Sequence, residues 1–288
     1  MIPPCARKVF LRRQLSSNVR PHTNTSSLMH PLSQLLCAAL LLLNAAHVYA
    51  QATSFKRSDG VEFAGIVDLP SGTGKAPAVV LAPGQGYHMA LPAMETTARA
   101  LAEQGFAVFR FNWTYFTAEP RRQPSPDLSV ETQDLQAVIA AARAHGRVDE
   151  RTVSVGGKSL GSVVAWRAFS ADPKLRSALL LTPVCSRVPR GESIPKPEAK
   201  ENYPGLESER RPSLWIAGDS DPLCSTSVLY TFAATGSKAT RVAIVGGDHS
   251  FENKALSVGE ADAFRARNLL SASTMAVGFV IEASRTPQ

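Results

Sequence analysis

The residues with the clearest chemical potential are a serine and the two glycines that flank it. Ser159 stands at the centre of GKSLG (157–161), a G-x-S-x-G pattern. The apolar residues 153–155 predict the end of a buried strand before it, and residues 162–169 predict a helix after it. A serine on such a tight turn exposes its hydroxyl above the sheet, within reach of a base and a carbonyl carbon. The pattern therefore predicts a nucleophile for acyl transfer.

A histidine and an acid that could assist the serine follow it along the chain. The apolar run 212–217 predicts a strand that ends just before Asp219 and Asp221, and the run 241–245 predicts another that ends just before His249. Open sheets of parallel strands bind ligands at the edge where the strands end. Of the six histidines, His249 alone combines this position with the order serine, acid, histidine. We therefore expect these residues and the serine to lie together.

Three aspartates compete for the role of the acid. Asp221 is favoured because it precedes Pro222 in a Gly-x-x-Asp-Pro loop, and the proline stiffens that loop. Asp219 is the alternative, and if it is not the acid we expect it to brace the turn through its own backbone. Asp248 is the weakest candidate because it is adjacent to His249, and adjacent side chains seldom face each other.

A glycine-rich turn offers a place for the negative oxygen that forms during acyl transfer. Residues 77–82 predict a buried strand, and PGQGY (83–87) follows it. An oxyanion hole takes one N–H from the residue after the nucleophile, here Leu160, and one from the loop after this earlier strand. The second donor is most simply Gln85. The other interpretation of this stretch is an ordinary turn.

These residues resemble a known family. From about residue 75 onward the chain is similar to dienelactone-hydrolase-like α/β-hydrolases, the family of the testis-expressed hydrolase-like proteins and of a nuclear histone-acetyltransferase-complex subunit. It departs from the broader superfamily at Pro83, where a histidine often precedes the glycine. The matching positions are Gly84, Gly86, Met89, Pro92, Ala98, Leu101, Ala102, Gly105, Phe106, 110–112, 156–162, Asp221, His249 and Ser250.

The resemblance implies a serine hydrolase of the carboxylesterase kind that acts on a small-molecule acyl substrate. Ser159 would attack, Asp221 and His249 would complete the triad, and the N–H groups of Leu160 and Gln85 would hold the oxyanion. Neither a metal nor an organic cofactor is required. Some relatives look like interaction proteins, so a non-catalytic binding protein of the same fold is the alternative.

The rest of the chain alternates strands and helices, as α/β proteins do. We expect a mostly parallel central sheet with helices on both faces, in a single domain at 51–288. The expected elements are a hairpin at 53–67, strands at 107–111 and 177–181, and helices at 90–103, 128–145 and 260–283.

Two stretches near the expected site have more than one interpretation. The segment 184–212 contains prolines and charges of both signs and lies between two predicted strands, so it could form a short lid or a solvated loop. The aromatic residues in 112–116 could line the mouth of the site or pack in the core.

The first 50 residues predict a signal peptide. They carry five Lys or Arg and no acidic residue, and an apolar run at 35–46 is too short to span a bilayer. Val48 and Ala50 have the small side chains that signal peptidase prefers before Gln51. Met29 is an alternative start, and an organellar transit peptide and a retained membrane anchor are the alternatives. We expect a periplasmic or secreted protein without a stable membrane span after cleavage.

Charge and cysteine content agree with this expectation. Removing five positive charges and no negative one lowers the net charge from +7 to about +2, which leaves no basic stripe for nucleic acid. Cys5 and Cys37 belong to the leader, while Cys185 and Cys224 follow predicted neighbouring strands. An exported protein could join the last two in a disulfide. Two unpaired, small apolar side chains are the favoured expectation.

Overall fold

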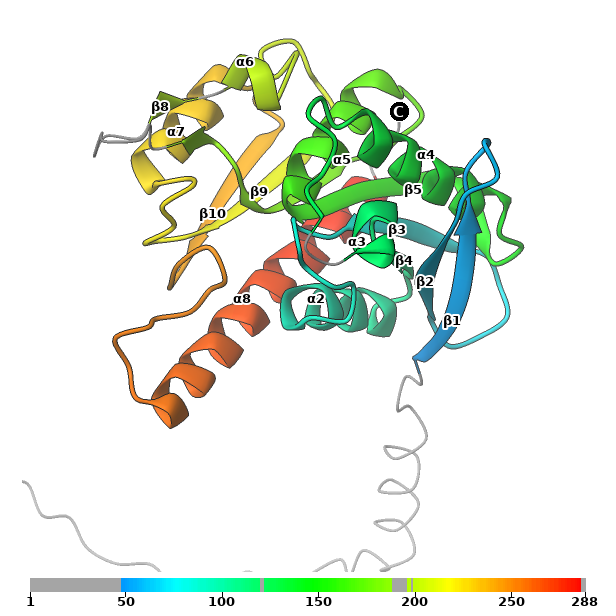
Figure 1. Cartoon of the computed structure of the whole chain (residues 1–288), viewed down its shortest axis with the longest axis horizontal. Helices are drawn as coiled ribbons and strands as arrows, with labels where there is room; N and C mark the ends of the chain where they lie inside the picture. The colour runs from blue at the N-terminus through cyan, green and yellow to red at the C-terminus, as the bar shows by residue number, and fades with distance from the viewer. Residues whose placement is uncertain (1–47, 120–121, 188–195, 198, 286–288) are drawn as a thin grey trace, which may run out of the picture. The chain divides into compact units, whose positions relative to one another are not determined.

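One eight-stranded sheet organises the part of the chain that the computed structural model describes, residues 48–119, 122–187, 196–197 and 199–285. Its strand order is β1-β2-β4-β3-β5-β6-β9-β10, and a separate pair, β7-β8, lies apart from it (Figure 1). The strands are β1 (Tyr49–Lys56), β2 (Glu62–Leu69), β3 (Ala76–Ala82), β4 (Ala107–Phe111), β5 (Val148–Ser159), β6 (Ala178–Pro183), β7 (Ser186–Arg187), β8 (Lys196–Pro197), β9 (Ser213–Gly218) and β10 (Thr240–Val245).

Helices cover both faces of this sheet. Side chains of α4, α5 and α7 share one buried apolar cluster with the sheet, and side chains of α2 and α8 share another on the opposite face. This arrangement confirms the expected α/β-hydrolase fold. The helices are α2 (Pro92–Glu103), α3 (Thr114–Ala118), α4 (Ser129–Ala144), α5 (Leu160–Ala171), α6 (Ala199–Asn202), α7 (Thr226–Thr235) and α8 (Val258–Arg285).

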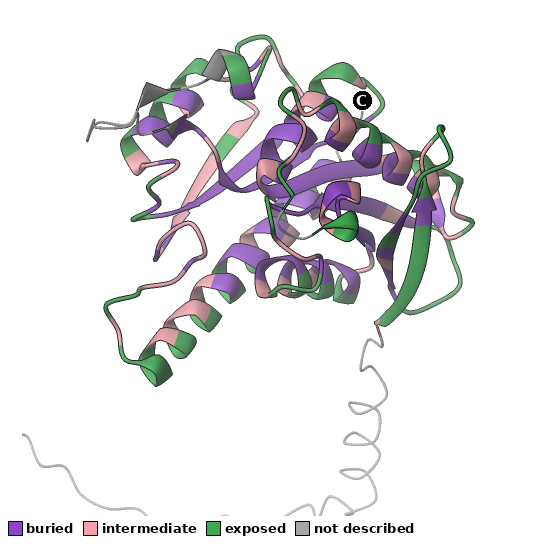
Figure 2. Cartoon of the chain, viewed as in Figure 1, coloured by how far each residue is buried: buried purple, intermediate pink, exposed green. Residues whose placement is uncertain are grey.

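Continuous apolar runs form the inner strands because both of their faces are covered. Every residue of β4, β6 and β9 is buried, as Figure 2 shows for the centre of the sheet. Six neighbouring strands of this sheet pair in parallel, in the order β4-β3-β5-β6-β9-β10, whereas β1 and β2 form an antiparallel hairpin at the edge. The parallel strands therefore all end at one edge, and the turns after them can share a site.

The end of the segment 184–212 is anchored in the core. Residues 188–195 and 198 lie outside the described residues, so the lid interpretation stays a prediction. The Tyr203 ring is buried 4.5 Å from the Trp215 ring and also contacts Trp166 and Phe232. The Tyr203 hydroxyl accepts a hydrogen bond from the Val184 N–H at 2.9 Å. These contacts fix the two sides of the segment where they meet the sheet.

A disulfide joins two of the turns at the edge where the strands end. Cys185, after β6, is bonded to Cys224, after β9, and their Cα atoms are 4.8 Å apart. The expectation of unpaired thiols is therefore wrong. The two turns are adjacent because β6 pairs with β9, and the N–H groups of Cys185 and Ser186 both donate to the Leu223 carbonyl. Strand pairing thus brings the sulfurs within bonding range.

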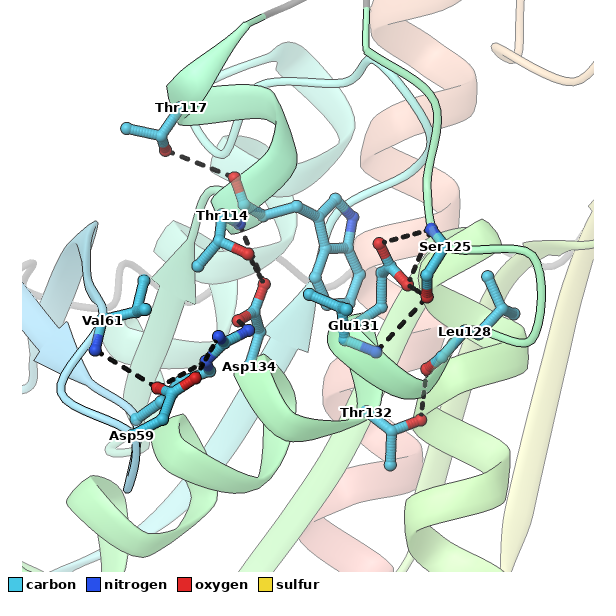
Figure 3. A network of polar contacts seen from close by, with 12 residues as sticks. Asp59, Val61, Thr114, Thr117, Ser125, Leu128, Glu131, Thr132 and Asp134 are labelled. Carbon is cyan, nitrogen blue, oxygen red and sulfur yellow. Dashed lines mark hydrogen bonds and ion pairs between the residues drawn. The ribbon is translucent and has the colours of Figure 1, made fainter.

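Buried carboxylates on α4 hold three neighbouring segments (Figure 3). Asp134 accepts two hydrogen bonds of 2.9 Å from Thr114 at the start of α3, and it faces the Arg57 guanidinium from the hairpin tip at 3.4 Å. Burial raises the pKa of Asp134 to about 6. The fully buried Glu131 accepts hydrogen bonds from the backbone N–H and the hydroxyl of Ser125. The loop before α4 is therefore fixed on that helix.

Replacing both bonded cysteines, in a Cys185→Ala/Cys224→Ala variant, is expected to lower the thermal stability without changing the fold. The bond closes a loop of 39 residues, which stabilises the fold by about 4 kcal/mol in the chain-entropy model. The melting temperature should fall by roughly 10 °C, measured by circular dichroism. Reductant should lower the melting temperature of the native protein and leave that of the variant unchanged. Equal melting temperatures for the two proteins would contradict the stabilising role.

Candidate active site

Ser159 lies on a strained turn between β5 and α5. Its backbone has φ 54° and ψ −121°, a left-handed conformation that a residue with a side chain rarely adopts. Flanking glycines allow this turn because a Cβ at Gly161 would lie 2.2 Å from the Ala82 carbonyl oxygen, and one at Gly157 would lie 2.2 Å from the Gly161 carbonyl oxygen. The turn is thus pressed against the end of β3. Ser159 is only half-buried, so its hydroxyl is accessible.

The three side chains singled out for acyl transfer form one hydrogen-bonded chain. His249 Nε2 lies 2.8 Å from Ser159 Oγ, and His249 Nδ1 lies 2.9 Å from Asp221 Oδ2 and 3.0 Å from Oδ1. The Asp221 carboxylate is fully buried, whereas the imidazole is 20% exposed. A buried acid on one ring nitrogen and a hydroxyl on the other is the arrangement in which histidine can take the hydroxyl proton.

The other two aspartates have structural partners. Asp219 is exposed and accepts a hydrogen bond of 2.9 Å from the N–H of Gly247, in the turn that carries the histidine. It therefore braces a neighbouring turn, not its own as expected. Asp248 accepts hydrogen bonds from the N–H groups of Ser250 and Glu252 and so shapes the same turn. Of the three, Asp221 is the one within hydrogen-bonding distance of the imidazole.

Four side chains from β4 and the residues just after it hold the turn that follows β3. The Trp113 indole donates to the Pro83 carbonyl at 3.0 Å, and the Tyr115 hydroxyl accepts from the Gly86 N–H at 3.3 Å. Both rings are buried, so these two aromatic residues pack in the core. Two further braces, Arg110 and Asn112, bind the backbone of Met89 at 2.8 and 2.9 Å.

The backbone N–H groups of Leu160 and Gln85 are the candidates for holding an oxyanion. Leu160 is the first residue of α5, and the first N–H groups of a helix have no acceptor within it. Gln85 follows β3 and lines the same cavity as Ser159 and Leu160. Its side-chain Nε2 donates to Oε1 of Gln123, another residue of the cavity wall, at 2.6 Å. The backbone N–H of Gln85 is the candidate for the second donor.

A cavity of about 540 Å³ opens beside Ser159. Its walls are mixed: apolar side chains such as Leu128, Leu160 and Val163 alternate with polar ones such as Gln123 and Arg167. Val184 and Asn202 also line it, so the ends of the segment 184–212 contribute to the wall. A second cavity of about 550 Å³ shares the loop at 123–126 but does not include the nucleophile.

The sequence interpretation overlooked Lys158, the residue before the nucleophile. Its side chain is buried, and Nζ donates to the carbonyl oxygen of His249 at 3.0 Å and to Thr182 Oγ1 at 3.3 Å. Nζ also lies 4.9 Å from the centre of the Tyr87 ring. Burial lowers the pKa of Lys158 to about 8, against the opposing charge of Asp221. The sequence shows a lysine inside GKSLG, but the burial of its side chain depends on turns that are distant along the chain.

The described part of the chain lacks two other kinds of feature. It contains no group of three or more His, Cys, Asp or Glu side chains that could hold a metal ion. None of its helices is both long enough and apolar enough to cross a membrane.

Comparison with known proteins bears on both the fold and the family. A family profile described as "Alpha/beta hydrolase domain" matches residues 75–276. No curated protein sequence matches the chain. Among solved structures, the esterase domain of a Rhodothermus marinus protein is 18% identical with a TM-score of 0.59, and the alignment covers 82% of this chain and 99% of that one.

Two further structures have the same fold. Dienelactone hydrolase from Anabaena variabilis is 16% identical with a TM-score of 0.62, over 82% of this chain and 98% of that one. A serine hydrolase "without lid" from Xanthomonas campestris is 21% identical with a TM-score of 0.58, over 83% and 97%. At such identities these similarities show the fold alone.

Exchanging each candidate acid for its amide should separate Asp221 from Asp219. Asp221→Asn is expected to lower the rate of ester hydrolysis on the order of 10⁴-fold, by analogy with the serine-protease acid, because the amide no longer fixes the imidazole tautomer. Asp219→Asn should change the rate little, since an amide oxygen can still accept from Gly247. Steady-state kinetics on a p-nitrophenyl ester measure both, and the opposite ranking would assign the acid to Asp219.

Proposed function

Because the chain belongs to the α/β-hydrolase domain family, we propose that it is a serine hydrolase, carboxylesterase-like, that cleaves an ester or related acyl bond. One observation carries this proposal: the continuous chain of hydrogen bonds from Asp221 through His249 to Ser159. The second supporting feature is the cavity beside the serine hydroxyl. Within the family, we propose that the chain belongs with the testis-expressed hydrolase-like proteins, on the motifs that it shares with them.

The proposed reaction has two halves. Ser159 Oγ attacks the carbonyl carbon while His249 Nε2 takes its proton, and the same imidazolium then protonates the leaving alcohol. Water, activated by the histidine, hydrolyses the acyl-enzyme and restores the serine. Asp221 holds the imidazole at Nδ1 and stabilises the positive charge of the ring. The complete burial of the Asp221 carboxylate suits it to this role.

The negative oxygen of each tetrahedral intermediate would be held by the N–H groups of Leu160 and Gln85. Donors that are fixed before the reaction stabilise the developing charge without reorganisation. The side chains that brace the turn at Pro83 and Gly86 supply this rigidity. The apolar part of the cavity wall, which includes Leu160 and Val163, offers a surface for the apolar portion of an acyl or alkyl group next to the nucleophile.

A non-catalytic binding protein with this fold is the alternative function. An interaction module has no use for a serine on a strained backbone whose hydroxyl is hydrogen-bonded to a histidine, which is held in turn by a buried acid. A fluorophosphonate probe separates the two functions, because it labels an activated serine whatever the natural substrate is.

Ser159→Ala and His249→Ala are each expected to abolish hydrolysis of p-nitrophenyl esters and labelling by the fluorophosphonate. Each loss should reach several orders of magnitude, and the double variant should be no worse than the single ones, because the residues act as a unit. A series of esters with increasing acyl length would define the preferred substrate.

The matched control for these variants is Ser170→Ala, an exposed serine on the same helix that follows the nucleophile. It should retain native activity, and circular dichroism should show that all variants are folded. Near-native turnover in a folded Ser159→Ala protein would disprove the proposed mechanism.

We also propose that the protein is exported to the periplasm or secreted, after removal of residues 1–50. Residues 1–47 lie outside the described residues, so this proposal rests on the sequence pattern and on the compatibility of the disulfide with an oxidising compartment. An organellar location is the alternative. Cleavage after Ala50 would leave Gln51 within β1, opposite Val67 of β2.

Intact-mass analysis of the exported protein tests this location. We expect a chain that begins at Gln51, with no thiol of Cys185 or Cys224 open to alkylation until reductant is added. A mass that includes the leader would contradict cleavage. Two alkylated thiols in the absence of reductant would contradict the bond.

A further inference from the structure

One buried cation has no part in the mechanism above. Lys158 is 3% exposed, although burial disfavours an ammonium group strongly. An apolar side chain of similar length would avoid this cost, and replacing buried ionic groups by apolar ones is often neutral or stabilising. The fold alone therefore gives no reason for a lysine in this position.

The contacts of Lys158 join several of the segments around the site. Its Nζ donates to the backbone carbonyl of His249, in the turn after β10, and to Thr182 at the end of β6. On another side the ammonium lies over the ring of Tyr87, the last residue of the turn that follows β3. Lys158 itself is joined by one peptide bond to Ser159. A single charge thus links Ser159, the turn that carries His249 and the turn that follows β3.

We propose that Lys158 is a positioning residue, whose buried ammonium holds the His249 turn and the Tyr87 turn in register with Ser159. This inference rests on the proposed hydrolase function and deepens it. The side chain does not line the cavity beside Ser159, so it acts through the groups that it holds. Its effect should therefore fall on kcat, with KM little changed, because the geometry of the reacting groups changes while the substrate pocket does not.

Charge is part of this role, because the ammonium is surrounded by groups that respond to it. Asp221 approaches from the turn after β9, Asp248 and Glu252 lie in the turn of His249, and all three favour the charged form. Tyr87 presents its ring, and His249 presents its carbonyl oxygen. Since burial lowers the pKa of Lys158 to about 8, the charge is present at neutral pH and is lost as the pH rises above that value.

The principal test compares Lys158→Met with the native protein. The methionine fills a similar volume without charge, so the melting temperature should be unchanged or raised while kcat falls roughly 10- to 100-fold, the cost of a small misplacement of reacting groups. Lys254→Met is the matched control, because Lys254 is 84% exposed and lies 4.0 Å from Asp248 in the same region. This control should keep native kcat.

The pH profile gives a readout that a purely structural role would not move. In the native protein kcat should decline above about pH 8, where the ammonium loses its proton. That decline should be absent from Lys158→Met and retained in Lys254→Met. The decline of kcat with pH in the native protein can be measured even if Lys158→Met does not fold. In that case Thr182→Val gives a second test. It removes one acceptor of the ammonium but keeps the charge, and it should lower kcat several-fold.

Hydrogen–deuterium exchange tests the positioning without relying on activity. Peptides that cover 83–89 and 246–253 should exchange faster in Lys158→Met than in the native protein and in Lys254→Met. Native kcat, exchange and pH profile in a folded Lys158→Met protein would overturn the proposal, as would a parallel loss of melting temperature and kcat. If the native protein shows no turnover that depends on Ser159, the proposed hydrolase function is wrong. The hydrogen–deuterium exchange measurement still shows whether Lys158 positions the two turns.

Discussion

The close packing of α5 against the end of β3 is the constraint on which the site depends. Without room for a Cβ at Gly161, the chain turns sharply between strand and helix and forces Ser159 into a left-handed conformation. Such strain persists only where the surroundings over-determine it. Here the surroundings are the paired strands on both sides of β5 and the apolar helices that cover them.

Around this turn the loops of the site are tied both to the sheet and to one another. The Arg110 guanidinium holds the Met89 carbonyl and forms a buried ion pair with Asp68 on β2, so the loop after β3 is tied across two strands. Asp219 holds the histidine turn from the neighbouring loop, and the disulfide fastens the acid loop from the other side. A change in one loop is therefore felt by the next.

Much of this organisation could be predicted from the sequence, because it depends on local patterns. Apolar runs of strand length, each followed by glycine or aspartate, were enough to place Ser159, Asp221 and His249 at one edge of the sheet. The braces could not be predicted in the same way. A buried Lys158 or a tryptophan that binds Pro83 depends on which loops meet in space, and the helices α3 and α7 are short or unpatterned. For Cys185 and Cys224 the sequence predicted neighbouring strands, but the bond depends on how closely the two following turns approach each other.

Both ends of the described domain lie away from the edge of the sheet that carries the candidate site. β1 starts opposite Leu69, at the end of β2 that pairs with the beginning of β4. The last turn of α8 is bound by Arg176, just before β6 begins. Both ends therefore lie where the parallel strands start, whereas the cavity beside Ser159 lies where they finish. A carrier protein, a solid support or an affinity tag joined at either end would leave the entrance to the cavity clear.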